Sequence, residues 1–339
     1  MDGRRLVRRT AAKTARTPTA ARLVTLLERA ARPRPGALAV LTYHRVDEPG
    51  RTPHLYPGLI SATPADFEEQ MLFLARNHRL LSLSELLAVR RGEAPPPPRS
   101  VMVTFDDAYR DVAEHAWPIM RRHGIPLTLF VPTAFPDEPG RAFWWDRLYA
   151  SLAGRGSVIS TPVGYLAVRT EEDRIRAFRQ LREHLKSLPY DRAKALVDEM
   201  SSEPGSRPPS PGSAVLRWDE LRRLAAEGVA LAPHSRTHPL LDKLPRKEAR
   251  REILRSLDDL EREIGPTPRA FAYPGGGCDD DVAAELEQQG FELGFLTARG
   301  ANDLHRPDWL RLRRINVGRT SGVSLIRLQL LPQWTRARQ

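Results

Sequence analysis

Short strand-like segments alternate with helical segments along most of this 339-residue chain, and this alternation constrains the fold more than any other feature. Compact apolar or β-branched runs predict strands at 37–43, 101–105, 127–131, 229–232, 270–273 and 291–296. Helical spacing predicts helices at 66–77, 84–91, 117–123, 218–227, 246–263 and 280–289. Strand and helix units repeating in this way predict an α/β fold around a parallel sheet, either closed or doubly wound.

One long stretch, residues 137–214, breaks the alternation. It contains the aromatic run Phe143-Trp144-Trp145, a charged segment that predicts one long helix over Glu171–Met200, and the Pro/Ser/Gly-rich run Ser201–Ser213. We interpret it as a helical insertion between two units of the α/β fold, ending in a flexible return. The two tryptophans could stack on a sugar, but packing between the insertion and the core is the expected role.

The positive charge of the chain, +11 overall, is concentrated at its two ends. Residues 1–35 carry ten Lys or Arg against two acids, and residues 306–339 carry eight Arg against one acid, so residues 36–305 have a net charge of −4. A nucleic-acid-binding protein would place its basic residues on the working face, so we expect no nucleic-acid partner. A solvated arm is expected at residues 1–36, with peripheral contact to anionic lipid as the alternative.

Three further features concern the compartment. No run approaches the ~20 apolar residues that span a bilayer, so no transmembrane helix is expected. Arg and Lys recur through position 34, which leaves no apolar core typical of a signal peptide. Cys278 is the only cysteine, so no intrachain disulfide can form. We therefore expect a cytoplasmic protein, with peripheral attachment at the inner face of the membrane as a variant.

Two adjacent carboxylates, Asp106 and Asp107, directly follow the strand predicted at 101–105. In parallel α/β folds ligands bind at the carboxyl ends of strands. Neighbouring side chains on an extended chain point in different directions, so one carboxylate could hold a metal while the other accepts a proton. The alternative is a structural role, because aspartate is also a favoured helix N-cap.

Two histidines, His234 and His238, follow the strand predicted at 229–232. Two imidazoles four residues apart on a turn or helix can face one ion, although this spacing alone is a weak signal. Two histidines with one carboxylate form a known ligand set for catalytic Zn²⁺ or a related divalent ion, and such a site leaves one position open for water.

A third segment, Arg269 to Gly277, follows the same rule: the predicted strand ends at Tyr273, and Pro274 and three glycines come after it. Glycines allow close approach of a substrate, and free backbone N–H groups there could hold an oxyanion. An ordinary exit from a strand into a loop would explain the glycines equally well.

Together these segments resemble the motifs of the polysaccharide deacetylase family, also known as NodB-homology or carbohydrate esterase family 4 proteins. The motifs occur in the same order: TFDD at 104–107, HSRTH at 234–238 and RAFAYP at 269–274. Three further runs resemble a branch of that family found among exopolysaccharide and lipopolysaccharide deacetylases. They are YHRV at 43–46, FWWDRL at 143–148 and LRRINV at 312–317. The resemblance covers residues 37–320 and leaves 321–339 as a basic tail.

The resemblance implies a distorted (β/α)₇ barrel that carries the helical insertion. It implies that Asp107, His234 and His238 bind one divalent metal, most simply Zn²⁺, with Co²⁺, Ni²⁺ or Mn²⁺ as alternatives. Asp106 would be the general base, held in place by Arg269, and the backbone N–H of Tyr273 would help to bind the oxyanion. The expected reaction is removal of N-acetyl groups from a sugar or polysaccharide, with a polymer, a short oligosaccharide and a lipid-linked glycan as the alternative substrates.

The chain departs from the family pattern at two places. Ala108 stands where the family usually has glycine after the two aspartates, which matters if that backbone needs a positive φ. No Leu-x-His sequence occurs near the C-terminus, where many members keep a general-acid histidine, and His305 has different neighbours. His44, at the end of the first predicted strand, is our candidate for that role, with a structural role as the alternative.

Two other functions fit the same residues. An O-acetyl esterase acting on carbohydrate would share the geometry of attack, so the sequence does not separate the two substrates. A non-catalytic sugar-binding relative is disfavoured, because the complete set of acidic and imidazole residues is present.

Overall fold

The computed structural model describes residues 26, 36–136, 138, 141–154, 156–202 and 214–331. Most of the predicted basic arm, the return segment 203–213 and the last residues of the predicted tail, 332–339, lie outside this described part. The expectations for the arm, including its contact with lipid, therefore stay predictions.

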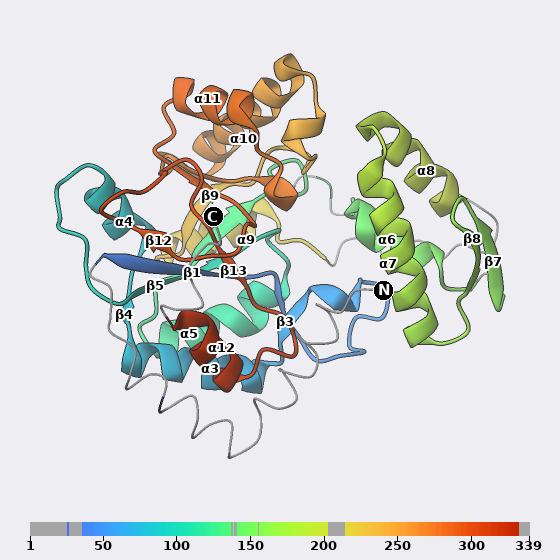
Figure 1. Cartoon of the computed structure of the whole chain (residues 1–339), viewed down its shortest axis with the longest axis horizontal. Helices are drawn as coiled ribbons and strands as arrows, with labels where there is room; N and C mark the ends of the chain where they lie inside the picture. Colours follow the sequence, from blue (N-terminus) through green and yellow to red (C-terminus); the bar gives the residue numbers. More distant parts are fainter. Residues whose placement is uncertain are drawn as a thin grey trace.

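Parallel strands form the centre of the described chain (Figure 1). Strand β1 (Ala37–Tyr43) pairs with β5 (Ser100–Phe105), β5 pairs with β6 (Thr128–Val131), and β6 pairs with β9 (Ala230–Pro233). Strand β10 (Ala270–Ala272) pairs with β11 (Leu293–Phe295). All of these pairings are parallel, as the strand and helix alternation predicts.

The strands are closed into a ring by a segment near the C-terminus. Leu312 forms a parallel bridge with Phe295 of β11, and three residues later β13 (Ile315–Asn316) pairs in parallel with β1. On the other side β9 and β10 lie next to each other without a hydrogen-bonded ladder. This irregular closure confirms the predicted distorted (β/α) barrel.

Two of the other short strands, β4 and β12, join the main sheet, and β2 and β3 form a separate pair. Strand β2 (Arg45–Val46) pairs with β3 (Ile60–Ala62), β4 (Arg79–Leu80) pairs with β5, and β12 (Asn302–Asp303) pairs antiparallel with β1. None of these short strands is predicted from the sequence, because strands of two or three residues show no periodicity.

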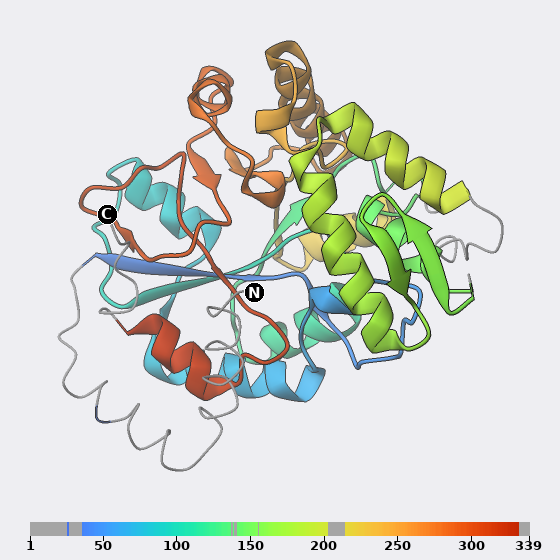
Figure 2. The same ribbon diagram turned by 45° about the vertical axis from the view of Figure 1, so that its right-hand side comes forward.

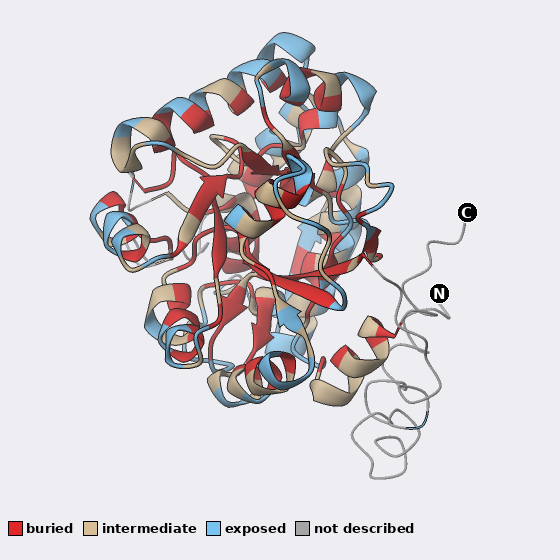
Figure 3. Ribbon diagram, turned by 90° about the vertical axis from the view of Figure 1, so that its left-hand side faces the viewer, coloured by how far each residue is buried: buried red, intermediate tan, exposed pale blue. Residues whose placement is uncertain are grey.

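Helices cover the outside of the ring, with their apolar faces turned toward the strands (Figure 3). Figure 1 shows α10 and α11 on one side of the strands and α3, α5 and α12 on the other. Their bounds are α3 (Pro64–Asn77), α4 (Leu83–Arg90), α5 (Trp117–Arg122), α9 (Trp218–Ala226), α10 (Arg246–Ile264), α11 (Asp280–Gln288) and α12 (Val323–Leu330). In the described part of the chain no helix is long and apolar enough to cross a membrane.

Local sequence explains where these helices begin. Thr63 caps α3 by accepting a hydrogen bond from the Asp66 N–H, and Pro64 occupies the first turn, where its missing N–H has no consequence.

Residues 321–331, assigned to the predicted tail, contain α12, which contacts α3 and buries Ile326. The part of the chain packed on the barrel therefore extends beyond residue 320.

The insertion forms a separate lobe beside the barrel (Figure 2). It contains α6 (Trp144–Ser151), the hairpin of β7 (Val158–Thr161) and β8 (Gly164–Ala167), α7 (Glu171–Ser187) and α8 (Tyr190–Ser202). The expectation of one helix over Glu171–Met200 is wrong, because the helix is interrupted at Leu188-Pro189. Proline disfavours helical backbone in the preceding residue, and Leu188 is extended, with a ψ of 154°.

A buried polar contact joins the insertion to the barrel. The Tyr109 hydroxyl, on the loop after β5, donates to the Asp146 carboxylate of α6 at 2.6 Å. The backbone N–H of Tyr56 donates to the other oxygen of Asp146 at 2.7 Å. Trp145, next to Asp146, is only 8% exposed, which confirms that it packs between insertion and core.

The buried Asp146 gives a testable dependence of stability on pH. Burial raises the pKa of Asp146 from 3.8 to about 6 despite its hydrogen bonds from Tyr109 and Tyr56. Between about pH 4 and pH 6 the folded protein keeps a proton that the unfolded chain has released, so its free energy of unfolding falls as pH rises through this window. Two pKa units correspond to about 3 kcal/mol. The difference in free energy of unfolding between Asp146→Asn and wild type should therefore increase, in favour of the variant, by up to this amount between pH 4 and pH 7.

Urea unfolding of both proteins at several pH values measures this difference. Two other buried groups also change the free energy of unfolding with pH. Burial raises the pKa of Asp111 to about 6, which acts in the same direction as Asp146, and burial lowers the pKa of His234 to about 4, which acts in the opposite direction. Both groups are present in wild type and variant, so their contributions cancel in the comparison. Parallel curves of unfolding free energy against pH would contradict the prediction.

Candidate metal centre

The candidate residues lie where parallel strands end. Asp106 and Asp107 follow β5, His234 follows β9, and His44 follows β1. Because the carboxyl ends of parallel strands share one edge, the chain brings these side chains together from positions up to 190 residues apart. This placement agrees with the expectation that the strand ends carry the chemistry.

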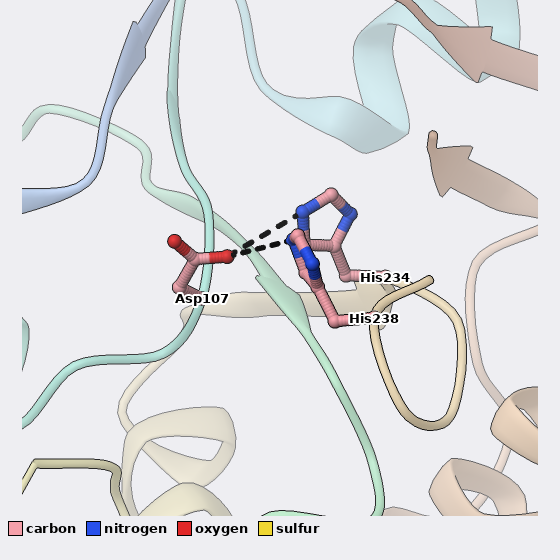
Figure 4. A group of neighbouring side chains, drawn as sticks. All are labelled: Asp107, His234 and His238. Atoms are coloured by element: carbon pink, nitrogen blue, oxygen red, sulfur yellow. Dashed lines mark ion pairs between the residues drawn. The ribbon is translucent and has the colours of Figure 1, made fainter. Parts of the chain in front are cut away.

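Three side chains converge on one point at this edge (Figure 4). Asp107, His234 and His238 each offer one atom, and these atoms lie within 4.8 Å of one another. The Nε2 atoms of His238 and His234 lie 3.2 Å and 3.6 Å from Oδ1 of Asp107. Asp107 and His234 are buried, and the His238 side chain is 11% exposed. The group therefore has the composition of a three-ligand site for a divalent metal.

Two observations test whether these residues suit a metal ion. Oδ1 of Asp107 is buried and accepts no hydrogen bond within the described part of the chain, which is costly unless a cation faces it. Nδ1 of His234 lies 2.7 Å from the carbonyl oxygen of Ala272 and donates to it, which directs the other ring nitrogen toward Asp107. Burial lowers the pKa of His234 to about 4, so this imidazole is neutral at pH 7, as a ligand must be. The residues fit a divalent metal.

The backbone of the site is held in an unusual conformation. Asp107, Ala108 and His238 have φ values of 71°, 52° and 63°, in the left-handed region that favours glycine. The alanine at position 108 therefore occupies a position whose backbone does require a positive φ. Conformations of this kind cost about 1–3 kcal/mol each and persist only where the surroundings fix them.

Glu252 of α10 fixes the loop that carries His238. Its carboxylate accepts hydrogen bonds from the backbone N–H groups of Arg236 and Thr237, at 2.9 Å and 2.7 Å, and from the Thr237 hydroxyl at 2.7 Å. The His238 N–H donates to the Ser235 hydroxyl at 3.0 Å. The sequence alone does not identify Glu252, because its place in the helix is one that any exposed acidic residue could occupy.

Asp106 is held by Arg314, which comes from the segment that closes the barrel. The guanidinium donates to both carboxylate oxygens, at 2.8 Å and 2.7 Å, and both side chains are almost completely buried. Burial alone would raise the pKa of Asp106, but the charge of Arg314 and its hydrogen bonds outweigh burial and hold the pKa well below its usual range. Asp106 is thus ionised at neutral pH and able to accept a proton.

The expectation that Arg269 holds Asp106 is wrong. Arg269 directly precedes β10, so it lies at the amino end of that strand, the opposite edge from the candidate site. It forms an ion pair with Glu261 at 3.0 Å and is partly exposed. Arg314 lies within the LRRINV run at 312–317, which carries part of the family resemblance. The run itself does not indicate which carboxylate Arg314 would pair with.

The expectation for the backbone N–H of Tyr273 is also wrong. This N–H donates to the carbonyl oxygen of Phe295 at 3.0 Å, as part of the pairing between β10 and β11, so it is not free to bind an oxyanion. The Tyr273 hydroxyl donates to the carbonyl oxygen of Leu310 at 2.9 Å. The following glycines have a structural reason: Gly276 has a φ of 81°, and a Cβ there would lie 2.2 Å from the Thr297 hydroxyl.

His44 lies near the two aspartates, and His305 does not. The His44 imidazole is close enough that its positive charge lowers the pKa of both Asp106 and Asp107. Its backbone N–H donates to the Ser61 hydroxyl at 3.0 Å. The His305 ring lies against Gly36, which directly precedes β1, so it lies at the opposite end of that strand from His44. Its position agrees with the expectation that His305 is not a replacement general acid.

Known proteins resemble this chain in both sequence and fold. YxkH of Bacillus subtilis (strain 168) is 25% identical over 269 residues, covering 79% of this chain and 67% of YxkH. The poly-β-1,6-N-acetyl-D-glucosamine N-deacetylase of Escherichia coli (strain K12) is 21% identical over 246 residues, covering 71% of this chain. The chain spans only 31% of the length of that E. coli relative.

A solved structure with a similar fold is the Streptococcus pyogenes deacetylase PplD in complex with acetate. It has a TM-score of 0.59 and 18% sequence identity, and the match covers 88% of this chain and 99% of PplD. At this identity the likeness concerns the fold. The family model for polysaccharide deacetylase matches residues 93–294, more than half of the chain and including Asp106, Asp107, His234 and His238. This chain therefore belongs to the polysaccharide deacetylase family.

Proposed function

We propose that the protein is a metal-dependent hydrolase that removes N-acetyl groups from a carbohydrate. The observation that carries this proposal is the convergence of Asp107, His234 and His238 beside the ionised Asp106. The substrate class is an N-acetylated sugar, oligosaccharide or lipid-linked glycan. The E. coli relative, named as an N-deacetylase of poly-β-1,6-N-acetyl-D-glucosamine, supports an amide rather than an ester substrate.

The three ligands define where a metal would act. A Zn²⁺, Co²⁺, Ni²⁺ or Mn²⁺ ion held by Asp107, His234 and His238 would supply Lewis acidity toward the acetyl carbonyl and lower the pKa of a water molecule. The buried, neutral His234 and the ionised Asp107 match the protonation states that metal binding requires.

Asp106 performs the proton transfer in this proposal. Its carboxylate takes a proton from the attacking water as the tetrahedral centre forms. The two hydrogen bonds from Arg314 fix the direction of the carboxylate, and one of its oxygens lies 3.9 Å from Nε2 of His234. The proton acceptor and the candidate ligands are therefore neighbours in one buried site.

His44 is the proposed proton donor for the leaving amine. It follows β1 on the same edge as Asp106 and Asp107, and it is partly exposed, so a substrate could reach it. Cleavage of an amide requires protonation of the nitrogen, since a free amide anion is a very poor leaving group. An ester substrate would need this proton less, which makes His44 a point of difference between the two reactions.

Metal analysis combined with acetate release tests the proposal. The protein is stripped with a chelator, reloaded with Zn²⁺, Co²⁺, Ni²⁺ or Mn²⁺, and assayed on N-acetylated and O-acetylated sugars in parallel. We expect about one equivalent of bound metal, acetate release only from the loaded protein, and preference for the N-acetylated substrate. Release from O-acetyl sugars alone would instead identify an esterase.

A pair of double variants controls for indirect effects. His234→Ala/His238→Ala should fold but bind no metal, whereas His115→Ala/His123→Ala removes two imidazoles outside the site and should bind metal like wild type. Circular dichroism checks that the variants are folded. A folded wild type that binds none of the four ions would refute the metal-dependent mechanism and leave a sugar-binding relative as the better account.

A further inference from the structure

The two candidate histidine ligands are oriented by different kinds of contact. The His234 ring donates a hydrogen bond to the carbonyl oxygen of Ala272, the usual way to fix a metal-bound imidazole. In the described part of the chain, the His238 ring has no comparable carbonyl or carboxylate partner on its second nitrogen. It lies instead against Trp145 and Phe143 of the insertion, with ring centroids 4.9 Å and 5.7 Å away and interplanar angles of 73° and 74°.

Trp145 is itself fixed from two directions. Its ring stacks on Phe143, with centroids 4.4 Å apart and an angle of 8° between the planes. Its indole N–H donates to the Tyr109 hydroxyl at 2.8 Å, and that hydroxyl donates to Asp146 at 2.6 Å. Tyr109 lies two residues after Asp107. This chain of hydrogen bonds therefore connects Trp145, which packs against His238, to the loop that carries Asp107.

The last residue of the insertion, Ala214, and Leu216 just after it contact the same loop. The backbone N–H of Leu216 donates to the carbonyl oxygen of Ala108 at 2.9 Å, and the N–H of Arg110 donates to that of Ala214 at 2.8 Å. These bonds lie at Ala108 and just after it, next to Asp107; both residues have left-handed backbone, which needs outside support to keep its conformation. Both ends of the insertion therefore hold the loop that carries Asp107.

We propose that the insertion is a structural part of the metal centre, with Trp145 as the positioning residue for His238. Tyr109 and Asp146 act through Trp145 and join it to the Asp107 loop. This inference rests on the proposed metal-dependent function, because it assigns the insertion a role in holding the ligands rather than in the chemistry. It predicts that changes in Trp145, or in the residues that hold it, alter metal affinity without removing a ligand.

Two matched tryptophan variants test the proposal on the full chain. Trp145→Phe keeps an aromatic ring but loses the N–H bond to Tyr109. Trp117→Phe makes the same change outside the site, where the indole N–H donates to Glu227 at 2.6 Å and the side chain is similarly buried, 7% exposed. The measurements are the Co²⁺ dissociation constant, by competition with a chelator, and the visible absorption spectrum of bound Co²⁺.

Trp145→Phe should weaken Co²⁺ binding by about 10-fold, the lower end of the effect of mutating partners of metal ligands, and should change the Co²⁺ spectrum. Trp117→Phe should lose a similar amount of stability but keep the wild-type affinity and spectrum. Wild-type affinity and spectrum in Trp145→Phe would overturn the proposal. A wild-type protein that binds no Co²⁺ would instead count against the proposed function itself.

A second pair covers the case in which Trp145→Phe does not fold. Tyr109→Phe keeps the Trp145 ring and removes only the hydroxyl that connects it to Asp146. Its control is Tyr43→Phe, which removes a buried hydroxyl that donates to Gln70 at 2.8 Å. Weaker Co²⁺ binding in Tyr109→Phe alone supports the proposal, and equal affinity in the two variants refutes it.

Discussion

Replacing Asp106 with asparagine should slow acetate release by about 10²- to 10⁴-fold, the range typical of losing a general base. The amide has nearly the shape of the carboxylate and can still accept a hydrogen bond from Arg314, but it cannot take a proton from water. The candidate ligands are untouched, so metal content should stay at the wild-type level. Steady-state rates and elemental analysis on the same preparation measure both quantities.

A comparison carboxylate separates this effect from a general loss of charge. Asp198 of α8 also pairs with an arginine, Arg147, at 2.7 Å, but it belongs to the insertion and is partly exposed. Asp198→Asn should retain the wild-type rate. If metal-loaded Asp106→Asn hydrolysed acetylated sugars as fast as wild type, the role of Asp106 as proton acceptor would have to be abandoned.

Arg314→Gln should lower the free energy of unfolding by about 3–5 kcal/mol, because breaking a buried pair leaves a carboxylate without its partner. Arg314 and Asp106 are 1% and 3% exposed at their side chains, so solvent cannot replace the lost contact. Loss of the guanidinium charge should also raise the pKa of Asp106 and reduce the ionised fraction that can act as a base. Urea unfolding and acetate release measure the two effects.

Arg269→Gln is the matched control, since Arg269 is the residue that the family resemblance indicates for the same role. Its partly exposed pair with Glu261 should contribute about 0–1 kcal/mol. We expect Arg269→Gln to unfold close to wild type and to keep its activity. Equal losses in the two variants would contradict the assignment of Arg314 to Asp106.

The parts of the site that depend on local sequence were predictable. Strand β1 runs over the predicted residues 37–43, and the acidic and histidine motifs do follow β5 and β9. Each motif directly follows a strand, and parallel strands bring their carboxyl ends to one edge whatever the details of the barrel. The convergence of Asp107, His234 and His238 therefore needed only the order of the elements.

The parts that depend on pairing between distant segments were not predictable. Arg314 reaches Asp106 only because residues 312–316 pass between β11 and β1, and the sequence does not state this closure. The N–H of Tyr273 is unavailable because β10 pairs with β11. The break at Pro189 differs, because the proline was visible and its effect on Leu188 follows from local sterics alone.

The closing segment also determines the order in which the site can be completed during synthesis. A ribosome releases the N-terminal part of a chain first, and domains begin to fold as they emerge. A chain that has emerged only through β11 already contains Asp106, Asp107, His234 and His238, but it lacks Arg314 and the residues that join β11 to β1. A truncated or unfinished product would thus carry all the candidate metal ligands while its proton acceptor stayed unpaired, so metal content alone would overestimate how much of a preparation is active.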